Sequence, residues 1–133
     1  MFVKSNEQME REAFVKQVVS NLERVIYEGG SGNFVIYEFA DPYYVQIASE
    51  RGAVSVHCEA VSNSSLKDGN ELNDDQLLAM YRLGWCDCSD SYNHTISLPV
   101  DSDQARKRIA ELFFDTAVIY GTTDITNVQV ELA

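Results

Sequence analysis

The sequence predicts an α+β domain in which an antiparallel sheet is flanked by helices, in the order α-β-β-β-α-β-α(-β), where the last strand is optional. Three features indicate this class. A long segment with helical apolar spacing opens the chain, three segments with apolar residues at every second position follow, and two later segments carry helix start and stop signals. The 133 residues contain no linker-like stretch, so we expect a single domain over residues 1–133.

The first helix is expected from about Asn6 to Tyr27. Ser5 and Gln8 form a capping-box pattern before it, and Gly29-Gly30 follows its end. The helical spacing persists although several residues are β-branched and lower the helix propensity. The residues expected to face the core are Phe14, Val15, Val18, Val19, Leu22, Val25 and Ile26. The glycine-rich loop that follows precedes a strand rather than a helix, so we interpret it as a turn and not as a phosphate-binding loop.

Three successive strands are expected at Phe34 to Phe39, Tyr43 to Ser49 and Ala53 to Val61, because apolar and polar residues alternate in each. Asp41-Pro42 forms the first connection and Glu50 to Gly52 the second. Both are short enough to require antiparallel hairpins. One face of the resulting sheet presents aliphatic side chains to the helices, and the other mixes Tyr, Gln, Ser and His, as expected for a face that is only partly covered.

The segment from Leu72 to Trp85 contains every signal of one short helix. Asn73 and Gln76 form a capping box at its start, Gly84 suits a left-handed residue at its end, and Trp85 is placed to fold back onto Met80. The expected apolar stripe consists of Leu77, Met80 and Tyr81, with Leu78 and Leu83 at its edges.

The last third of the chain is expected to add a strand, a helix and a short edge strand. The strand runs from Tyr92 to Leu98. Asp101 with Gln104 provides the cap of the helix that follows, and this helix ends at Tyr120-Gly121. Alternating residues from Asn127 to Leu132 indicate the edge strand.

The formal net charge is −11 and the isoelectric point is near 4.4, which argues against a nucleic-acid partner. Eight acids against two basic residues lie between residues 67 and 103, and we expect one strongly negative face. A solvated, solubilising surface and a docking patch for a basic partner both explain that face. The eight acids are Asp68, Glu71, Asp74, Asp75, Asp87, Asp90, Asp101 and Asp103.

The sequence also favours a cytoplasmic protein that does not enter a membrane. No apolar run approaches the length of a membrane span, and the first residues lack the apolar core of a secretory signal. The three cysteines, Cys58, Cys86 and Cys88, are then expected to be free thiols rather than a disulfide framework.

Candidate reactive residues do not assemble into a recognisable catalytic set. His57 and Cys58 are neighbours on a strand, so their side chains point to opposite faces. Cys86 and Cys88 lie among acids, which raise a thiol pKa. With His94 they offer three possible metal ligands, but the spacing differs from that of structural zinc sites. We therefore predict no catalytic residues and no metal, and keep an enzyme or metal protein that uses Cys86, Cys88 and His94 as the third alternative.

The residues from Tyr44 to Tyr120 resemble a family of small bacterial domains grouped with the type III secretion chaperones and the YbjN-like proteins. The most specific similarity is the Leu83-Gly84-Trp85 helix end after the Val61-Ser62-Asn63 strand exit. The other matching stretches are Tyr44-Val45-Gln46-Ile47, Glu59-Ala60, Leu72 to Gln76 and Tyr120-Gly121. The chain departs from the family where it has Cys86-Asp87-Cys88 in place of prolines and His94-Thr95 in place of a second aromatic residue.

The resemblance implies an antiparallel sheet flanked by helices, no cofactor, a possible homodimer, and binding of an extended client protein or peptide rather than catalysis. Strand addition and side-chain pockets provide the physical basis for such binding. Tyr37, Tyr44, Gln46 and His57, which we expect on the less aliphatic sheet face, are the candidate peptide contacts. Leu83, Gly84 and Trp85 are expected to be structural. The alternative function is an acidic immunity-type protein that neutralises a basic toxin.

Overall fold

The computed structural model describes residues 5–86 and 93–133. Its elements follow the predicted order: α1 (Asn6–Tyr27), β1 (Asn33–Glu38), β2 (Tyr44–Ser49), β3 (Ser55–Val61), α2 (Asp74–Leu83), β4 (Asn93–Pro99), α3 (Asp103–Tyr120) and β5 (Asn127–Glu131). Asp87, Cys88, Asp90 and Tyr92, which the sequence analysis named, lie outside the described residues. The α+β prediction is confirmed, including the last strand.

The five strands form one sheet in the order β4-β3-β2-β1-β5, and every neighbouring pair is antiparallel. The register aligns Val35 with Ile47, Ile47 with Cys58, and Cys58 with Ile96, so one continuous row of apolar side chains crosses the sheet from β1 to β4. Residues that are opposite one another in antiparallel strands share a face. This row therefore fixes which face of every strand is apolar.

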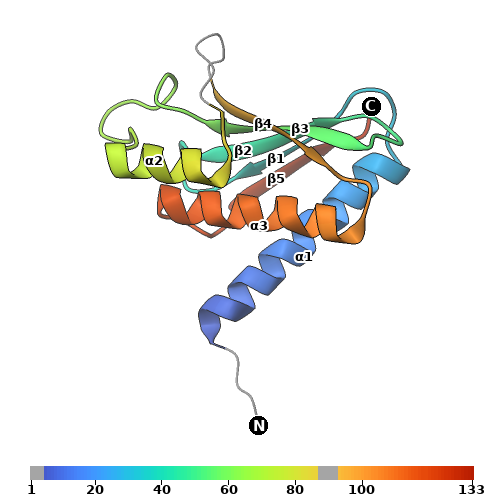
Figure 1. Cartoon of the computed structure of the whole chain (residues 1–133), viewed down its shortest axis with the longest axis horizontal. Helices are drawn as coiled ribbons and strands as arrows, with labels where there is room; N and C mark the ends of the chain where they lie inside the picture. Colours follow the sequence, from blue (N-terminus) through green and yellow to red (C-terminus); the bar gives the residue numbers. More distant parts are fainter. Residues whose placement is uncertain (1–4, 87–92) are drawn as a thin grey trace.

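All three helices lie on one side of the sheet (Figure 1). The strand residues on that side are fully buried in the middle of the sheet, among them Val35, Val45 and Cys58, and mostly half-buried in the outer strands β4 and β5. α3 lies between α1 and α2, and it buries half of its eighteen residues because it contacts both helices and the sheet, while Lys107, Arg108 and Val118 remain exposed on its outer side. Aromatic side chains join the helices: Phe14 of α1 contacts Phe114 of α3 edge to face at 5.3 Å between ring centroids, and Phe113 of α3 stacks on Trp85, which follows α2, at 6.4 Å.

The helix signals of the first two helices are confirmed. Both predicted capping boxes are present, at Ser5 with Gln8 and at Asn73 with Gln76. Gly84 has a φ of 106° and ends α2 in the left-handed conformation, where a residue with a Cβ is strained. The Trp85 N–H donates to the Met80 carbonyl at 3.3 Å, so the chain does fold back at this point.

Two predictions about the helices are wrong. Ser102, not Asp101, caps α3, and its Oγ accepts the Ala105 N–H at 3.0 Å. The reason is that the Val100 N–H is bonded to the Val54 carbonyl, which keeps the chain in the sheet and delays the helix start. Tyr81 does not face the core but is 73% exposed, because α2 lies at the margin of the core and buries only a narrow stripe centred on Met80.

Within the described ranges, 5–86 and 93–133, no helix is both long enough and apolar enough to cross a membrane.

Candidate binding surface

The sheet face opposite the helices is the candidate site, and we call it the open face. In the described part of the chain, no helix lies on this face (Figure 1). Its members alternate along each strand with the buried residues, and the register aligns them across the sheet. They are Phe34, Ile36, Glu38, Tyr44, Gln46, Ala48, Ser55, His57, Glu59, Thr95, Ser97, Asn127, Gln129 and Glu131.

Phe34 and Ile36 form the apolar centre of the open face. Both are half-buried, and neither packs against the hydrophobic core, in contrast to most of the other half-buried apolar side chains. Ile36 lies between Gln46 and Gln129, and Phe34 is next to Ala48. Apolar side chains in the middle of an otherwise polar exposed face are typical of a surface that meets another molecule.

Tyr37, one of the four predicted peptide contacts, lies on the other face. It has no exposed surface, its hydroxyl accepts a hydrogen bond from the Asn21 side chain at 3.1 Å, and burial raises its pKa well above the ordinary value. The prediction that it lies on the open face is wrong. The two-residue period of β1 assigns Tyr37 to the same side as Val35, whose side chain belongs to the core.

The other three predicted contacts lie on the open face, along the length of β2 and the adjoining strand. Tyr44 is half-buried at the start of β2, and its hydroxyl accepts a hydrogen bond from Asn93 at 3.3 Å. Gln46 is half-buried in the middle and donates to the Glu59 carboxylate. His57 is exposed and lines a hollow of about 390 Å³ near the turn between β2 and β3. The structure therefore places these three residues on one surface.

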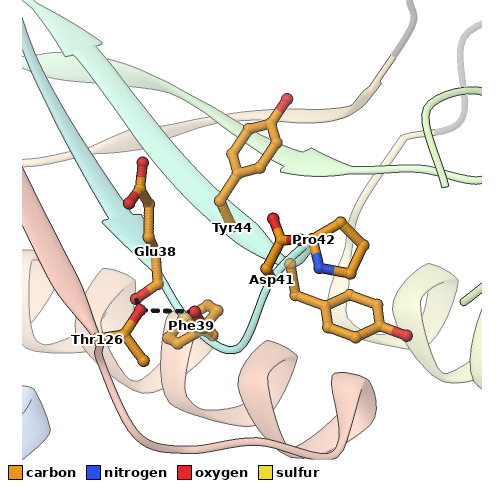
Figure 2. A pocket seen from close by; sticks show the side chains of 7 residues that line it. Glu38, Phe39, Asp41, Pro42, Tyr44 and Thr126 are labelled. Carbon is orange, nitrogen blue, oxygen red and sulfur yellow. Dashed lines mark hydrogen bonds between the residues drawn. The ribbon is translucent and has the colours of Figure 1, made fainter.

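A second hollow, of about 260 Å³, lies where the connection between β1 and β2 meets Thr126, and we call it the hairpin hollow (Figure 2). Its walls are Glu38, Phe39, Asp41, Pro42, Tyr43, Tyr44 and Thr126. The Thr126 hydroxyl fixes one side by donating to the carbonyls of Phe39, at 2.7 Å, and Glu38, at 3.1 Å. Tyr44 and Glu38, which belong to the open face, are among its walls.

Two side-chain amides hold the Glu38 carboxylate at the hairpin hollow. One carboxylate oxygen accepts the side-chain amide of Asn127 at 3.1 Å, and the other accepts that of Gln129 at 3.0 Å. Both donors are neutral, so they orient the carboxylate without cancelling its charge. The two-residue alternation that the sequence predicts for this strand places Phe34, Ile36 and Glu38 on one face, but we did not select them as contacts. The alternation was the available signal for all three.

The two edges of the sheet differ in accessibility. On the β4 side, Cys86 and Thr95 exchange two backbone hydrogen bonds, of 2.8 and 3.0 Å, and Pro99 ends the strand without an N–H. On the β5 side, the Gly32 N–H donates to the Ala133 carbonyl at 2.9 Å. In an antiparallel pair the backbone groups of successive residues point alternately toward and away from the partner strand, so the N–H and C=O groups of Val128 and Val130 point away from β1. No strand of the described chain pairs with that outer side of β5.

Among the described residues considered for catalysis, His57 and Cys58 do not form a pair. Cys58 has no exposed surface, and its burial raises its pKa to about 12, so the thiolate is disfavoured. His57 lies on the opposite face from Cys58, as the strand alternation predicted. Over residues 5–86 and 93–133, no three His, Cys, Asp or Glu side chains are grouped closely enough to hold a metal ion.

The described acids between residues 67 and 103 that belong to α2 and α3 lie far apart in the structure. Asp74 and Asp75 lie in the first turn of α2, where Gln76 donates to the Ile119 carbonyl near the end of α3. Asp103 lies at the opposite end of α3, roughly 25 Å away for a helix of this length. The sequence count could not show that the length of α3 separates these acids, and the single negative face stays a prediction.

The fold and the open face together define a two-layer α+β domain that leaves one face of its antiparallel sheet uncovered. The chain belongs to the TY-Chap3 family, described as T3SS (YopN, CesT) and YbjN peptide-binding chaperone 3, because the family model matches residues 16–118. The resemblance seen in the sequence is thus confirmed, and the family is one of peptide-binding chaperones. Neither the curated proteins nor the solved structures contain a match to this chain.

Proposed function

We propose that this chain is a non-catalytic, chaperone-like protein of the cytoplasm that binds an extended segment of a client protein on its open face. One observation carries the proposal: Phe34 and Ile36 are half-buried apolar side chains on a sheet face that no described helix covers. Covering them with a client side chain would remove apolar surface from water at about 25 cal/mol per Å².

The proposed contacts are Tyr44, Gln46 and His57 together with this apolar centre. Tyr44 provides a large aromatic surface with a polar end, and the Gln46 amide and the His57 ring can hydrogen-bond the backbone of an extended segment. Such contacts do not depend on the client's side chains, which suits a protein that holds an unfolded segment. A segment that crosses the open face toward β5 would also meet the outward backbone groups of Val128 and Val130, where strand addition is available.

Site-specific photocross-linking in the native host tests this proposal. A benzoylphenylalanine residue at Tyr44 should form adducts with client segments, which mass spectrometry then maps. The matched control is the same residue at Tyr81, which is 73% exposed on α2, away from the open face. Adducts from position 44 and none from position 81 would support the proposal. Adducts from position 81 alone, or from neither position, would contradict it.

The immunity-type alternative receives less support. It relied on a dense acidic face, and the described acids of that segment lie at both ends of α3. Many simultaneous charge pairs with a basic toxin would make binding weaken steeply between about 50 and 500 mM salt. Contact through an apolar centre predicts a shallow dependence instead, so the salt dependence of client affinity distinguishes the two functions.

A homodimer is part of the same proposal. Light scattering after size exclusion would give twice the chain mass of 15.0 kDa if the dimer forms, and the chain mass alone if it does not.

A further inference from the structure

We infer that the client segment carried by the open face is basic as well as apolar, and that one of its Lys or Arg side chains occupies the hairpin hollow. This inference rests on the proposed function, because it concerns the same surface. It adds the chemical class of the segment, which the apolar centre by itself does not specify.

The charge of the open face is entirely of one sign among its strand residues. The five strands contain no Lys and no Arg, whereas Glu38, Glu59 and Glu131 all belong to the open face. The connection between β2 and β3 contains one basic residue, Arg51. It follows the end of β2 that is farther from the hairpin hollow. A cationic segment is therefore attracted to this face, and an acidic one is repelled.

No ion pair of the described residues involves the three strand carboxylates. Glu38 accepts from two amides and Glu59 accepts from Gln46, and all of these donors are uncharged. Within the described residues, the ion pairs are formed by Arg11, Arg24 and Arg106, and all of them lie on helices. The negative charge of the open face thus remains available to a partner.

The hairpin hollow has the parts of a site for an ammonium or guanidinium group. Figure 2 shows Glu38 and Tyr44 projecting from neighbouring strands, with Asp41 beside them on the connection. Two carboxylates can accept the N–H groups of a Lys or Arg side chain, and the Tyr44 ring can pair with its cation. Because Asn127 and Gln129 already hold Glu38, little side-chain freedom would be lost when the cation binds.

The spacing along β1 matches that of an extended client. Side chains on one side of an extended segment recur every second residue, or roughly 6.8 Å. Glu38, Ile36 and Phe34 follow one another on the open face with this same two-residue period. A segment that runs along β1 with a basic residue opposite Glu38 would therefore place its next two same-side residues over Ile36 and Phe34. The client segment is therefore expected to have a basic residue at one position and apolar residues two and four positions away from it.

Nuclear magnetic resonance titration of the ¹⁵N-labelled full chain with defined peptides tests the inference. The probe is acetyl-Arg-Thr-Val-Thr-Val-amide, and the comparison peptide has citrulline, the neutral isostere, in place of Arg. We expect both peptides to shift the amides of the open face, and the Arg peptide to bind about fivefold more tightly. Asp41→Asn and Glu38→Gln should each reduce this ratio toward one.

Glu23→Gln is the matched control, since it removes the same charge from the exposed side of α1 and should leave the ratio unchanged. Equal affinity for the two peptides, with shifts on the open face, would overturn the inference and leave the proposed function intact. No open-face shift with either peptide would overturn both. An equal loss of selectivity in the Glu23→Gln variant would also overturn the inference, because the preference would then reflect net charge alone.

Discussion

Replacement of Asn33 by Ala should destabilise the fold far more than its position in a glycine-rich loop suggests. Asn33 is 2% exposed, its amide donates to the carbonyls of Val25, at 2.8 Å, and Gly30, at 3.2 Å, and its oxygen accepts the Gly30 N–H at 2.9 Å. The side chain thus ties the last turn of α1 to the start of β1. Its removal would leave a buried Val25 carbonyl without this donor.

The expected cost is about 2–3 kcal/mol, taking roughly 1 kcal/mol for each net hydrogen bond and allowing water to reach the partly exposed Gly30. That corresponds to a fall in melting temperature of roughly 6–12 °C for a domain of this size. Urea unfolding followed by fluorescence measures it directly, because Trp85 is the single Trp and is 2% exposed.

Asn127→Ala is the matched control. Asn127 is exposed in β5 and makes one side-chain hydrogen bond to Glu38, so its loss should cost less than about 0.5 kcal/mol. An Asn33→Ala variant as stable as Asn127→Ala would refute the reasoning, because the three bonds of Asn33 would then contribute nothing beyond a surface contact.

Three further predictions follow from single positions. Thr116→Val should cost about 1–2 kcal/mol in urea unfolding, because the buried Trp85 indole N–H loses its acceptor at 3.0 Å; a wild-type midpoint would contradict this. Gly84→Ala should cost about 1–2 kcal/mol, since φ is 106° and the new Cβ would lie 3.1 Å from Ile96 Cδ1, whereas Gly32→Ala, with no atom within 4 Å, should change the melting temperature little. Cys58 should make the free energy of unfolding fall as pH rises from about 9 toward the folded pKa of about 12, because the unfolded chain releases the thiol proton first. Cys58→Ala should show a smaller fall in the free energy of unfolding between about pH 8 and 10.5. The same slope in the variant and the wild type would contradict this role of Cys58.

The sequence by itself determined the order of the elements and most of their ends. Capping boxes are local, because the N-cap residue and the residue three positions later bond to each other's backbone N–H groups. The pairs Ser5 with Gln8 and Asn73 with Gln76 could therefore be predicted from the sequence alone. The two-residue period likewise separated the two sides of each strand. Assigning Tyr37 to the open face was an error of selection, since its alternation with Ile36 already indicated the core side.

Only the tertiary structure decided which polar residues meet. Thr126 and Asp41 line the same hollow although they are far apart in the sequence, because β5 returns to pair with β1. The acids around α2 and α3 are close in sequence but separated in space by the length of a helix. Local periodicity specifies the orientation of a side chain relative to its own element, whereas the packing of one element against another specifies its neighbours. The open face follows from periodicity, and the hairpin hollow from packing.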